Sequence, residues 1–548
     1  MDHQESLVRR CQRTALHAPN HRFCRSFTTI CPTFALAAAF AASSAMAQDG
    51  SFDASWAPRN SDQKGSPGLF EDTYALGGGG IYAGDMTATT TIVQSDGKML
   101  VAGFGWNTAG STDQNACVMR RYNADGSTDT SFAGGGVFVQ NWTSGLSNPK
   151  TDCYFKSITL QPDGKILVAG QIVYAVGNDA EGVVERLLPN GSLDTGFNGN
   201  GVRKTGIWSD VNSVLLAGNG DIFLAGSWIA PNFSDTDFYL ITLDTSGNQT
   251  AYTAAHFDVP GSDHNDSGNS AVLESWSSGT IGNFHSHDEV YLVGSANNPS
   301  HASGLAHHSC GIAAFRRNDG GPFSLDSGFN GSGLLNVDFP VGTLDTDTIC
   351  RTATRRPGTT LLGPNGVVVG GERYYTPSGA SLGSASYYAL EDIDAGGTVT
   401  RDDAFAFFAD LNEAGAFNSI NAMAWDDIGK LVTVGYAGIG ANGDQTHVPS
   451  DGAIRRFNVD FSVDSSFSAD HSGTLLVSLD TSGAGGIVQA QREWLNAVAV
   501  DPLHGRMVFA GERSILISLV PNLYAWFLGA AHDGTVQVSD RIFANGFD

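Results

Sequence analysis

Histidines gather in one part of the chain, and they are the residues best suited to metal chemistry. Seven of the eleven histidines beyond residue 47 lie between residues 256 and 308. Neutral imidazole is a common ligand of zinc and other transition metals. A strand expected at 290–294 would hold His285 and His287 roughly 17–20 Å from the histidines that follow it. The predicted divalent-cation site therefore uses the remaining five: His256, His264, His301, His307 and His308.

Two alternatives stay open for oxygen- and nitrogen-rich loops of this kind. Surface loops rich in Ser, Asn and His are often simply solvated, which is the other interpretation of the histidine cluster. Asn123, Asp125 and Asp129 offer oxygens at alternate positions, loosely like a calcium loop. The full loop signature is absent, and Asp and Asn at turns usually hydrogen-bond to their own backbone. We therefore interpret these three residues as turn formers, and no other cofactor is indicated.

Carboxylates could also do acid–base chemistry in two equivalent places. Glu372-Arg373 and Glu512-Arg513 each follow the glycine that ends a short apolar strand. A pair of carboxylates on one face can serve as acid and base, but local ion pairs explain the same residues. The sequence has no Gly-x-Ser-x-Gly elbow, no Walker loop and no dinucleotide fingerprint. We therefore predict no catalytic and no cofactor-binding residue.

Four cysteines beyond residue 47 predict two disulfides. Four cysteines allow three pairings. Two of them begin a third strand and two precede a first strand, at similar separations of 36 and 40 residues. The repeat equivalence favours Cys117–Cys153 with Cys310–Cys350, and such bridges form in oxidising compartments.

The elements that position these residues are short strands in a long repeat. Hairpin turns such as Asp163-Gly164 supply the positive φ angles that a two-residue turn requires. The strand after each turn ends in a small apolar phrase whose final glycines recur at a mean spacing of 68 residues: Gly103, Gly170, Gly226, Gly294, Gly370, Gly435 and Gly511. A β-rich unit at such a period predicts a propeller or a solenoid.

A second phrase, Asp-x-[Ser/Gly]-aromatic, follows the third strand of several units. Full copies begin at Asp129, Asp194, Asp326 and Asp464. Four antiparallel strands per unit and seven units predict an all-β fold, a seven-bladed β-propeller. One further copy, Asp53 to Trp56, precedes the first unit, whereas the last unit has no copy of the phrase. We therefore expect residues 53–58 to pair with 514–520 and complete the last blade, which would remove open sheet edges.

The N-terminus has the pattern of an export signal. Basic residues precede an apolar stretch at 34–42, and Ala45-Met46-Ala47 forms a small-residue cleavage site. The apolar stretch is too short to span a bilayer. We expect a signal peptide at 1–47, a propeller at 48–522 and a tail at 523–548. After cleavage near Ala47 the protein would be periplasmic, on the cell surface or secreted.

Charge narrows the class of partner. The formal net charge is −26, with 56 acidic and 30 basic residues. Such a surface repels nucleic acid and anionic lipid. We expect no nucleic-acid partner, no membrane span and a monomer that binds a glycan or a protein.

The repeat resembles a known family. The segments at 163–170 and 183–202, DGKILVAG and VVERLLPNGSLDTGFNGNGV, are similar to the delta-60 repeat of exported bacterial proteins. The resemblance is close in units one and two, partial in four and six, and weak in the others. It implies a propeller-like fold and export, and it implies no general activity.

These observations predict a non-enzymatic exported propeller that acts as a binding or structural protein of the cell envelope or the extracellular space. The alternative is a lyase or hydrolase of polysaccharide or lactone on the same scaffold, metal-assisted if the histidines bind a cation. Fold alone does not choose between them, because propellers host many functions.

Overall fold

The computed structural model describes most of the chain beyond residue 50. The described ranges are 51–56, 63–66, 68–72, 86–107, 114–142, 151–174, 180–229, 236–257, 266–280, 283–298, 307–337, 346–356, 364–375, 385–402, 418–438, 450–477, 491–517 and 520–532. All of them lie in one compact unit, residues 47–548. Within these ranges the one helical element is a 3₁₀ turn, η1 Phe132–Gly134, so the all-β prediction is confirmed. No helix in the described ranges has the length and apolar character needed to cross a membrane.

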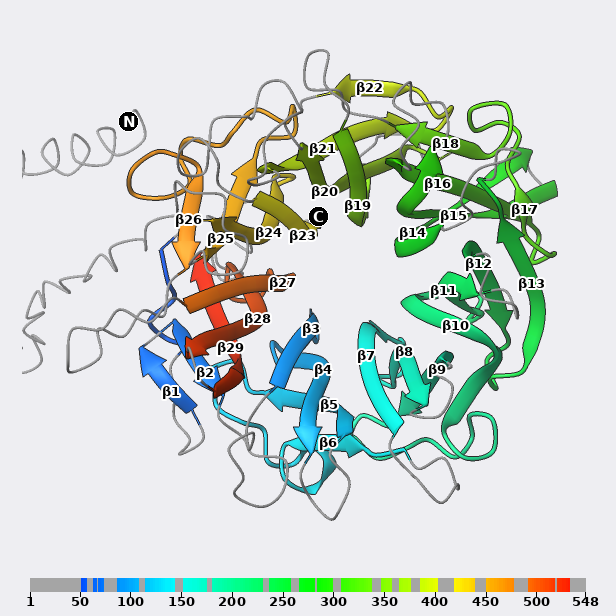
Figure 1. The fold of residues 1–548 in the computed structure, drawn as a ribbon. Helices are drawn as coiled ribbons and strands as arrows, with labels where there is room; N and C mark the ends of the chain where they lie inside the picture. The colour runs from blue at the N-terminus through cyan, green and yellow to red at the C-terminus, as the bar shows by residue number, and fades with distance from the viewer. Residues whose placement is uncertain are drawn as a thin grey trace, which may run out of the picture. The chain divides into compact units, whose positions relative to one another are not determined.

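The strands form successive antiparallel groups, each running outward from a central space (Figure 1). The first group is β3 Met86–Val93, β4 Met99–Asn107, β5 Gln114–Tyr122 and β6 Val137–Gln140. The second is β7 Thr151–Leu160, β8 Ile166–Tyr174, β9 Ala180–Leu187 and the start of β10 Val202–Leu216. The third begins with the rest of β10 and continues with β11 Ile222–Ile229, β12 Thr236–Leu243 and β13 Gln249–Ala255. Because β10 serves two groups, they form one sheet of seven strands.

The later groups follow the same order. The fourth is β14 Ser267–Thr280, β15 Asn283–Asn298, β16 His307–Asn318, β17 Ser324–Leu325 and β18 Leu334–Val337. The fifth is β19 Thr346–Arg355, β20 Gly366–Tyr375, β21 Ala385–Asp394 and β22 Val399–Asp402. The sixth is β23 Asn418–Trp425, β24 Leu431–Gly438, β25 Ser450–Phe457 and β26 Thr474–Val477. The last is β27 Gln491–Asp501, β28 Arg506–Ile517 and β29 Val520–His532, joined by β2 Leu69–Asp72 and β1 Gln63–Ser66. None of these sheets closes on itself.

A β-bulge interrupts the first strand of every group. One residue is skipped in the register with the second strand, and the skipped residues are Thr89, Lys156, Asn212, Asn269, Arg351, Asn421 and Asn496. We call these the bulge residues. The recurring glycine of the second strand lies opposite the bulge, where a Cβ on Gly103 would come within 2.0 Å of the Thr87 carbonyl oxygen. In the fifth group this glycine is Gly371, not the adjacent Gly370 that the spacing suggested.

The Asp-x-[Ser/Gly]-aromatic phrase joins neighbouring groups. Asp129 accepts hydrogen bonds from Ser131 and from Arg121, whose Nε lies 2.8 Å from the carboxylate. Arg121 covers the ring of Phe132 and donates to the Pro189 carbonyl in the second group. Phe132 is fully buried in a cluster made largely of second-group residues. The phrase is thus a structural joint between neighbouring groups, and its Asp129 is a turn former, as predicted from the sequence.

The stray N-terminal copy makes the same joint in the last group, on a different strand from the one expected. Asp53 donates its backbone N–H to Ala530 and accepts a hydrogen bond from Arg506, while β2 pairs with β29. The expected pairing of residues 53–58 with 514–520 is therefore wrong. The second strand, β28, extends to Ile517 and so includes most of the 514–520 segment, and the third strand is β29. β29 also runs ten residues past 522, where the tail was expected to begin.

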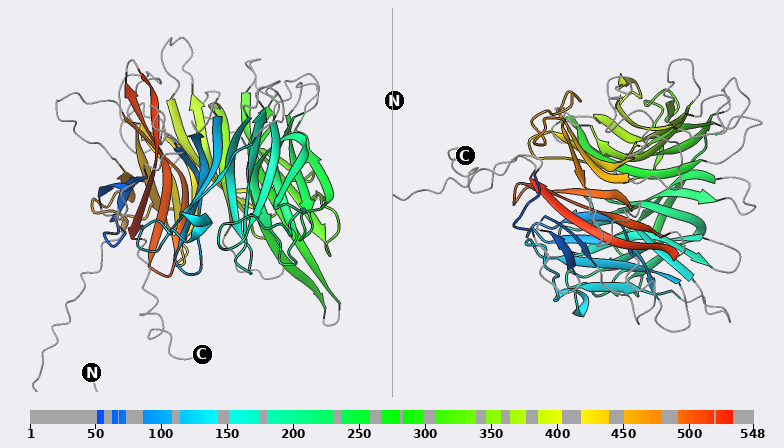
Figure 2. Two further views of the ribbon diagram at one scale, coloured as in Figure 1. Left: turned by 90° about the horizontal axis from the view of Figure 1, so that it is seen from below. Right: turned by 60° about the vertical axis from the view of Figure 1, so that its left-hand side comes forward.

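Both expected disulfides are present, and each crosses between groups. Cys117–Cys153 joins β5 to β7, and Cys310–Cys350 joins β16 to β19. All four cysteines are almost completely buried. Figure 2 shows a further feature of the fourth group, a β14–β15 hairpin that projects well beyond the ends of its neighbours.

Candidate functional site: the central channel

A cavity of about 950 Å³ lies at the centre of the strand groups. It is lined by the first strand of each group, and by one residue each from β4, β24 and β28. Twelve of its 25 lining residues are Thr, Ser or Asn, so the wall is mainly polar and uncharged. Of the lining residues within the described ranges, three are charged: Lys156, Arg351 and Glu512.

All the bulge residues face this cavity, and most of them bond across to the next group. The bulge places an extra side chain inward, as bulges near binding sites often do. The Asn212 amide donates to the Gly268 carbonyl, and the Asn496 amide to the Ala88 carbonyl at 3.0 Å. Each acceptor is the residue just before the next bulge. Three more bulge residues make the same bond: Thr89 to Phe155, Asn269 to Cys350 and Asn421 to Leu495.

The two cationic bulge residues are instead neutralised by carboxylates. Lys156 bonds to both oxygens of Asp210 on the neighbouring first strand, at 2.7 and 2.5 Å. The Nε of Arg351 lies 2.8 Å from a carboxylate oxygen of Glu372, which is completely buried. Neither cation is therefore available as an unpaired anion-binding group.

One side of the channel carries a distinct set of residues, which we call the channel arc. It consists of three pairs of side chains. In each pair, one residue directly follows the recurring glycine of a second strand, and the other lies two positions before the bulge residue of the next group. The rings of Tyr436 and Trp494 are centred 5.4 Å apart. Thr87 donates a 2.7 Å hydrogen bond to Glu512. The ring of Phe104, which lines the cavity, meets edge-on at 4.7 Å the ring of Tyr154, which is not one of the lining residues.

Glu512 lies at the middle of the channel arc. Burial raises the pKa of its carboxyl above the usual range, and the hydrogen bond from Thr87 offsets part of that rise. The other glutamate expected to do acid–base work, Glu372, occupies the equivalent place in the fifth group. It is buried, ion-paired with Arg351 and hydrogen-bonded by the Tyr436 hydroxyl at 3.3 Å. The two carboxyls thus have different settings, and only Glu512 lines the cavity.

The histidines expected to bind a cation are only partly within the described ranges. His264 and His301 lie outside them, and so does the side chain of His307. His256 places its Nδ1 2.7 Å from the buried Asp237 carboxylate. His308 lies on β16 opposite Asn297. Within the described ranges no three His, Cys, Asp or Glu residues are grouped so as to hold a metal, so the site stays a prediction.

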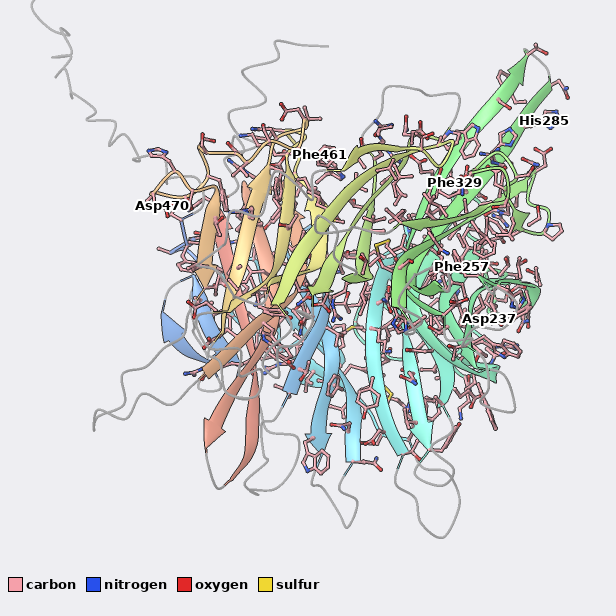
Figure 3. All side chains as sticks on the ribbon, turned by 45° about the horizontal axis from the view of Figure 1, so that its top comes forward. Asp237, Phe257, His285, Phe329, Phe461 and Asp470 are labelled. Atoms are coloured by element: carbon pink, nitrogen blue, oxygen red, sulfur yellow. A yellow bond between two sulfur atoms is a disulfide. The ribbon has the colours of Figure 1, made fainter. Side chains whose placement is uncertain are left out.

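His285 and His287 lie farther from that loop than expected. They belong to β15 itself, which starts at Asn283, and not to a turn before residue 290. His308 pairs with Asn297 of β15, which lies ten residues after His287 on the same strand. At 3.3 Å per residue, His287 is therefore roughly 33 Å from His308. Figure 3 shows His285 near the end of the projecting hairpin, away from Asp237 and Phe257. Its Nδ1 lies 2.7 Å from Asp319.

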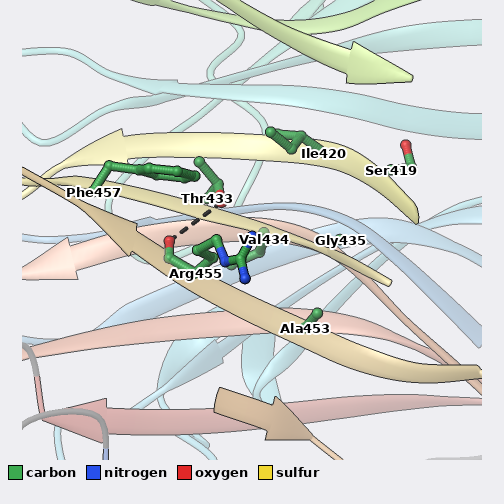
Figure 4. Close-up of a pocket in the computed structure, with 8 residues that line it drawn as sticks. All are labelled: Ser419, Ile420, Thr433, Val434, Gly435, Ala453, Arg455 and Phe457. Atoms are coloured by element: carbon green, nitrogen blue, oxygen red, sulfur yellow. Dashed lines mark hydrogen bonds between the residues drawn. The ribbon is translucent and has the colours of Figure 1, made fainter. Parts of the chain in front are cut away.

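The proposed calcium ligands are already engaged. Asp125 accepts from the Ser127 amide and hydroxyl, and Asp129 bonds Arg121 and Lys98. The contacts of Asp125 are the turn-forming contacts that the sequence predicted, and the ion pairs of Asp129 with Lys98 and Arg121 were not predicted. A second cavity, between β23, β24 and β25 (Figure 4), measures about 10 Å³. That is the room needed for about one water molecule, so it is a packing void.

Sequence reasoning missed the bulge residues and most of the channel arc. A signal was available, because an Asn followed by Ser or Ala lies within the first strand of four units: Asn212, Asn269, Asn421 and Asn496. The two recurring phrases lie outside the channel wall: the glycine phrase is on the second strand, and the Asp-x-[Ser/Gly]-aromatic phrase is on the connection after the third strand.

Comparisons with known proteins bear on the fold. Residues 94–132 and 161–197 match the family model described as a domain of unknown function (DUF5122) beta-propeller. The fold is a β-propeller. A search of the curated proteins finds no match.

Solved structures of low similarity were also found. The beta-propeller domain of the Trilobed protease from Pyrococcus furiosus is 9% identical, with a TM-score of 0.34, over 84% of this chain and 98% of that one. The alpha-L-arabinofuranosidase Arb93A from Fusarium graminearum is 11% identical, with a TM-score of 0.34, over 70% and 93%. Scores this low carry no argument about activity.

Proposed function

We propose that this chain is an exported, seven-bladed propeller, closed into a ring by its N-terminal strand, that binds a glycan in its central channel. The wall of the channel carries the proposal. Hydroxyl and amide groups can exchange hydrogen bonds with sugar hydroxyls, and aromatic rings present apolar faces for sugar rings. An anionic ligand is disfavoured, because the two cations of the channel wall, Lys156 and Arg351, are already neutralised by Asp210 and Glu372.

Four contacts between the last and first groups support ring closure. Asn496 bonds to Ala88, and Arg506 bonds to the Ala124 carbonyl. Arg120 of β5 pairs with Asp72 of β2. Trp56 and Phe70 share one buried cluster with residues of β3, β4 and β28. Two buried disulfides support export, since such bridges persist in oxidising compartments.

The test is a binding screen on residues 48–548, with neutral and charged oligosaccharides measured by titration calorimetry. Trp494→Ala removes one ring of the channel arc and should weaken any glycan that binds by about 1–3 kcal/mol, as large aromatic contacts in binding sites do. Tyr252→Ala is the matched control, because Tyr252 is an exposed aromatic on β13 outside the cavity. Absence of binding across the screen, or equal loss in both variants, would contradict the proposal.

A lyase or hydrolase is the second candidate, and Glu512 is the observation in its favour. A carboxyl with a raised pKa suits a general acid. Glycoside hydrolysis by two carboxylates needs a second one within reach of the substrate, and among the described residues Glu372 is buried and ion-paired. Binding is therefore the preferred function. Release of shorter products that Glu512→Gln abolishes would favour the enzyme instead.

A further inference from the structure

Glu512 stands out because, among the residues that the structure describes, it is the one carboxylate that lines the cavity. Each cation in that wall already has a partner, Asp210 for Lys156 and Glu372 for Arg351. The basic residue next in sequence, Arg513, bonds to Glu71 and Glu493. Glu512 itself is held by the hydroxyl of Thr87. When its carboxyl is ionised, Glu512 is therefore the charged residue of the described channel wall that has no oppositely charged partner.

Aromatic pairs flank this carboxyl on both sides. Tyr436 and Trp494 lie at the contact between the sixth and the last group. Phe104 and Tyr154 lie at the contact between the first and the second group, which is two group-to-group contacts away. Packed sheets lie about 10 Å apart, so these pairs span roughly 20 Å, which is longer than a single sugar ring. Aromatic faces attract cations as well as the apolar faces of sugars. A ligand that suits the channel arc is therefore extended, ring-shaped in its units and positively charged near the centre.

We propose that the channel arc binds an oligosaccharide with protonated amino groups, of the glucosamine type, and places one ammonium group on Glu512. The inference rests on the proposed function and narrows its ligand class. An ammonium offers three donors to a carboxylate, and its charge compensates the cost of keeping Glu512 ionised out of bulk water. The net charge of −26 also favours the approach of a cationic ligand.

The experiment compares three six-unit oligosaccharides on residues 48–548: glucosamine hexamer, its fully N-acetylated form, and cellohexaose. A hydrogen bond to a charged group predicts about tenfold to a hundredfold tighter binding of the glucosamine hexamer. Glu512→Gln keeps the side-chain shape and should remove this preference, because it lowers the affinity for the glucosamine hexamer much more than that for the acetylated hexamer. Asp163→Asn is the matched control, since it removes one acidic charge from an exposed turn outside the cavity. Thermal unfolding of each variant confirms that the fold is intact.

Lowering the pH supplies a second measurement. Binding of the glucosamine hexamer should weaken as Glu512 takes up its proton, and in Glu512→Gln this weakening should disappear. Equal affinities for the glucosamine and acetylated hexamers would overturn the inference and leave the glycan-binding function standing. No binding of any of the three, nor of any oligosaccharide in the wider screen, would overturn both.

Discussion

Replacing Asn496 by Ala should loosen the contact between the first and last strand groups. The Asn496 amide lies 3.0 Å from the carbonyl oxygen of Ala88, a residue with no exposed surface. Removing the donor leaves that buried acceptor without this partner, which costs about 1–3 kcal/mol. Hydrogen exchange followed by mass spectrometry should therefore show faster exchange in β3 and β27. A thermal melt should show a lower unfolding temperature.

The repeat provides a matched control for this change. Asn269 makes the same bond at 2.8 Å to Cys350, but there a disulfide from Cys310 also holds the two groups together. Asn269→Ala should lower stability without local opening of β14 and β19 while the disulfide is intact. Asn496→Asp should behave like the Ala variant at neutral pH and recover in acid, because the new carboxyl donates only when protonated. Unchanged exchange in β3 and β27, or equal opening at both seams, would refute the reasoning.

Three further predictions follow from buried and clustered groups. Cys117→Ser opens a bridge across 36 residues, and by loop entropy it should cost about 4 kcal/mol, measured as denaturant stability under non-reducing conditions; equal stability of variant and wild type would contradict it. Burial raises the pKa of Glu185 to about 8, so its proton is bound more tightly in the folded state and stability should fall as pH rises from about 4.5 towards 8, by up to about 5 kcal/mol at 1.4 per unit. Glu185→Gln should flatten that slope, and an unchanged pH profile would exclude the effect. If the predicted cation site exists, metal analysis of the purified protein should find a divalent ion that changing His307 and His308 to Ala removes; metal at background in the wild type would end that hypothesis.

Much of the architecture was predictable because the turns and the phrases act locally. Asp163-Gly164 lies in the turn of its hairpin as expected, and Gly164 has a positive φ of 82°. The turn is longer than the expected two residues, because Gln161 and Lys165 close it with a backbone hydrogen bond and Asp163 keeps a negative φ. The disulfides followed from equivalent positions in repeats. The last group was not predictable, because Pro521 looks like the end of a strand but lies at the second residue of β29, where a missing N–H is tolerated near a strand end. β14 and β15 were underestimated because their projecting halves are rich in Ser, Gly and His.

The channel was harder to predict, because its residues are set by register. Asn212 and Ser213 both line the cavity because a bulge interrupts the strand between Val211 and Ser213. In a regular strand neighbouring side chains point to opposite faces, and a one-residue shift exchanges those faces. The channel arc combines residues more than 400 positions apart, such as Thr87 and Glu512. No pattern of neighbouring residues in the sequence predicts a contact between positions so far apart.

The pairing of β2 with β29 makes the two earliest strands of the sheet, β1 and β2, depend on the latest one. During synthesis and translocation, β2 emerges long before its partner and must wait without it. A chain that stops before β29 leaves the edges of both β2 and β28 open, and open edges recruit other chains. Truncated products should therefore aggregate or be degraded rather than persist as smaller folded proteins. The β2–β29 pairing thus makes stable folding depend on synthesis of the chain through β29.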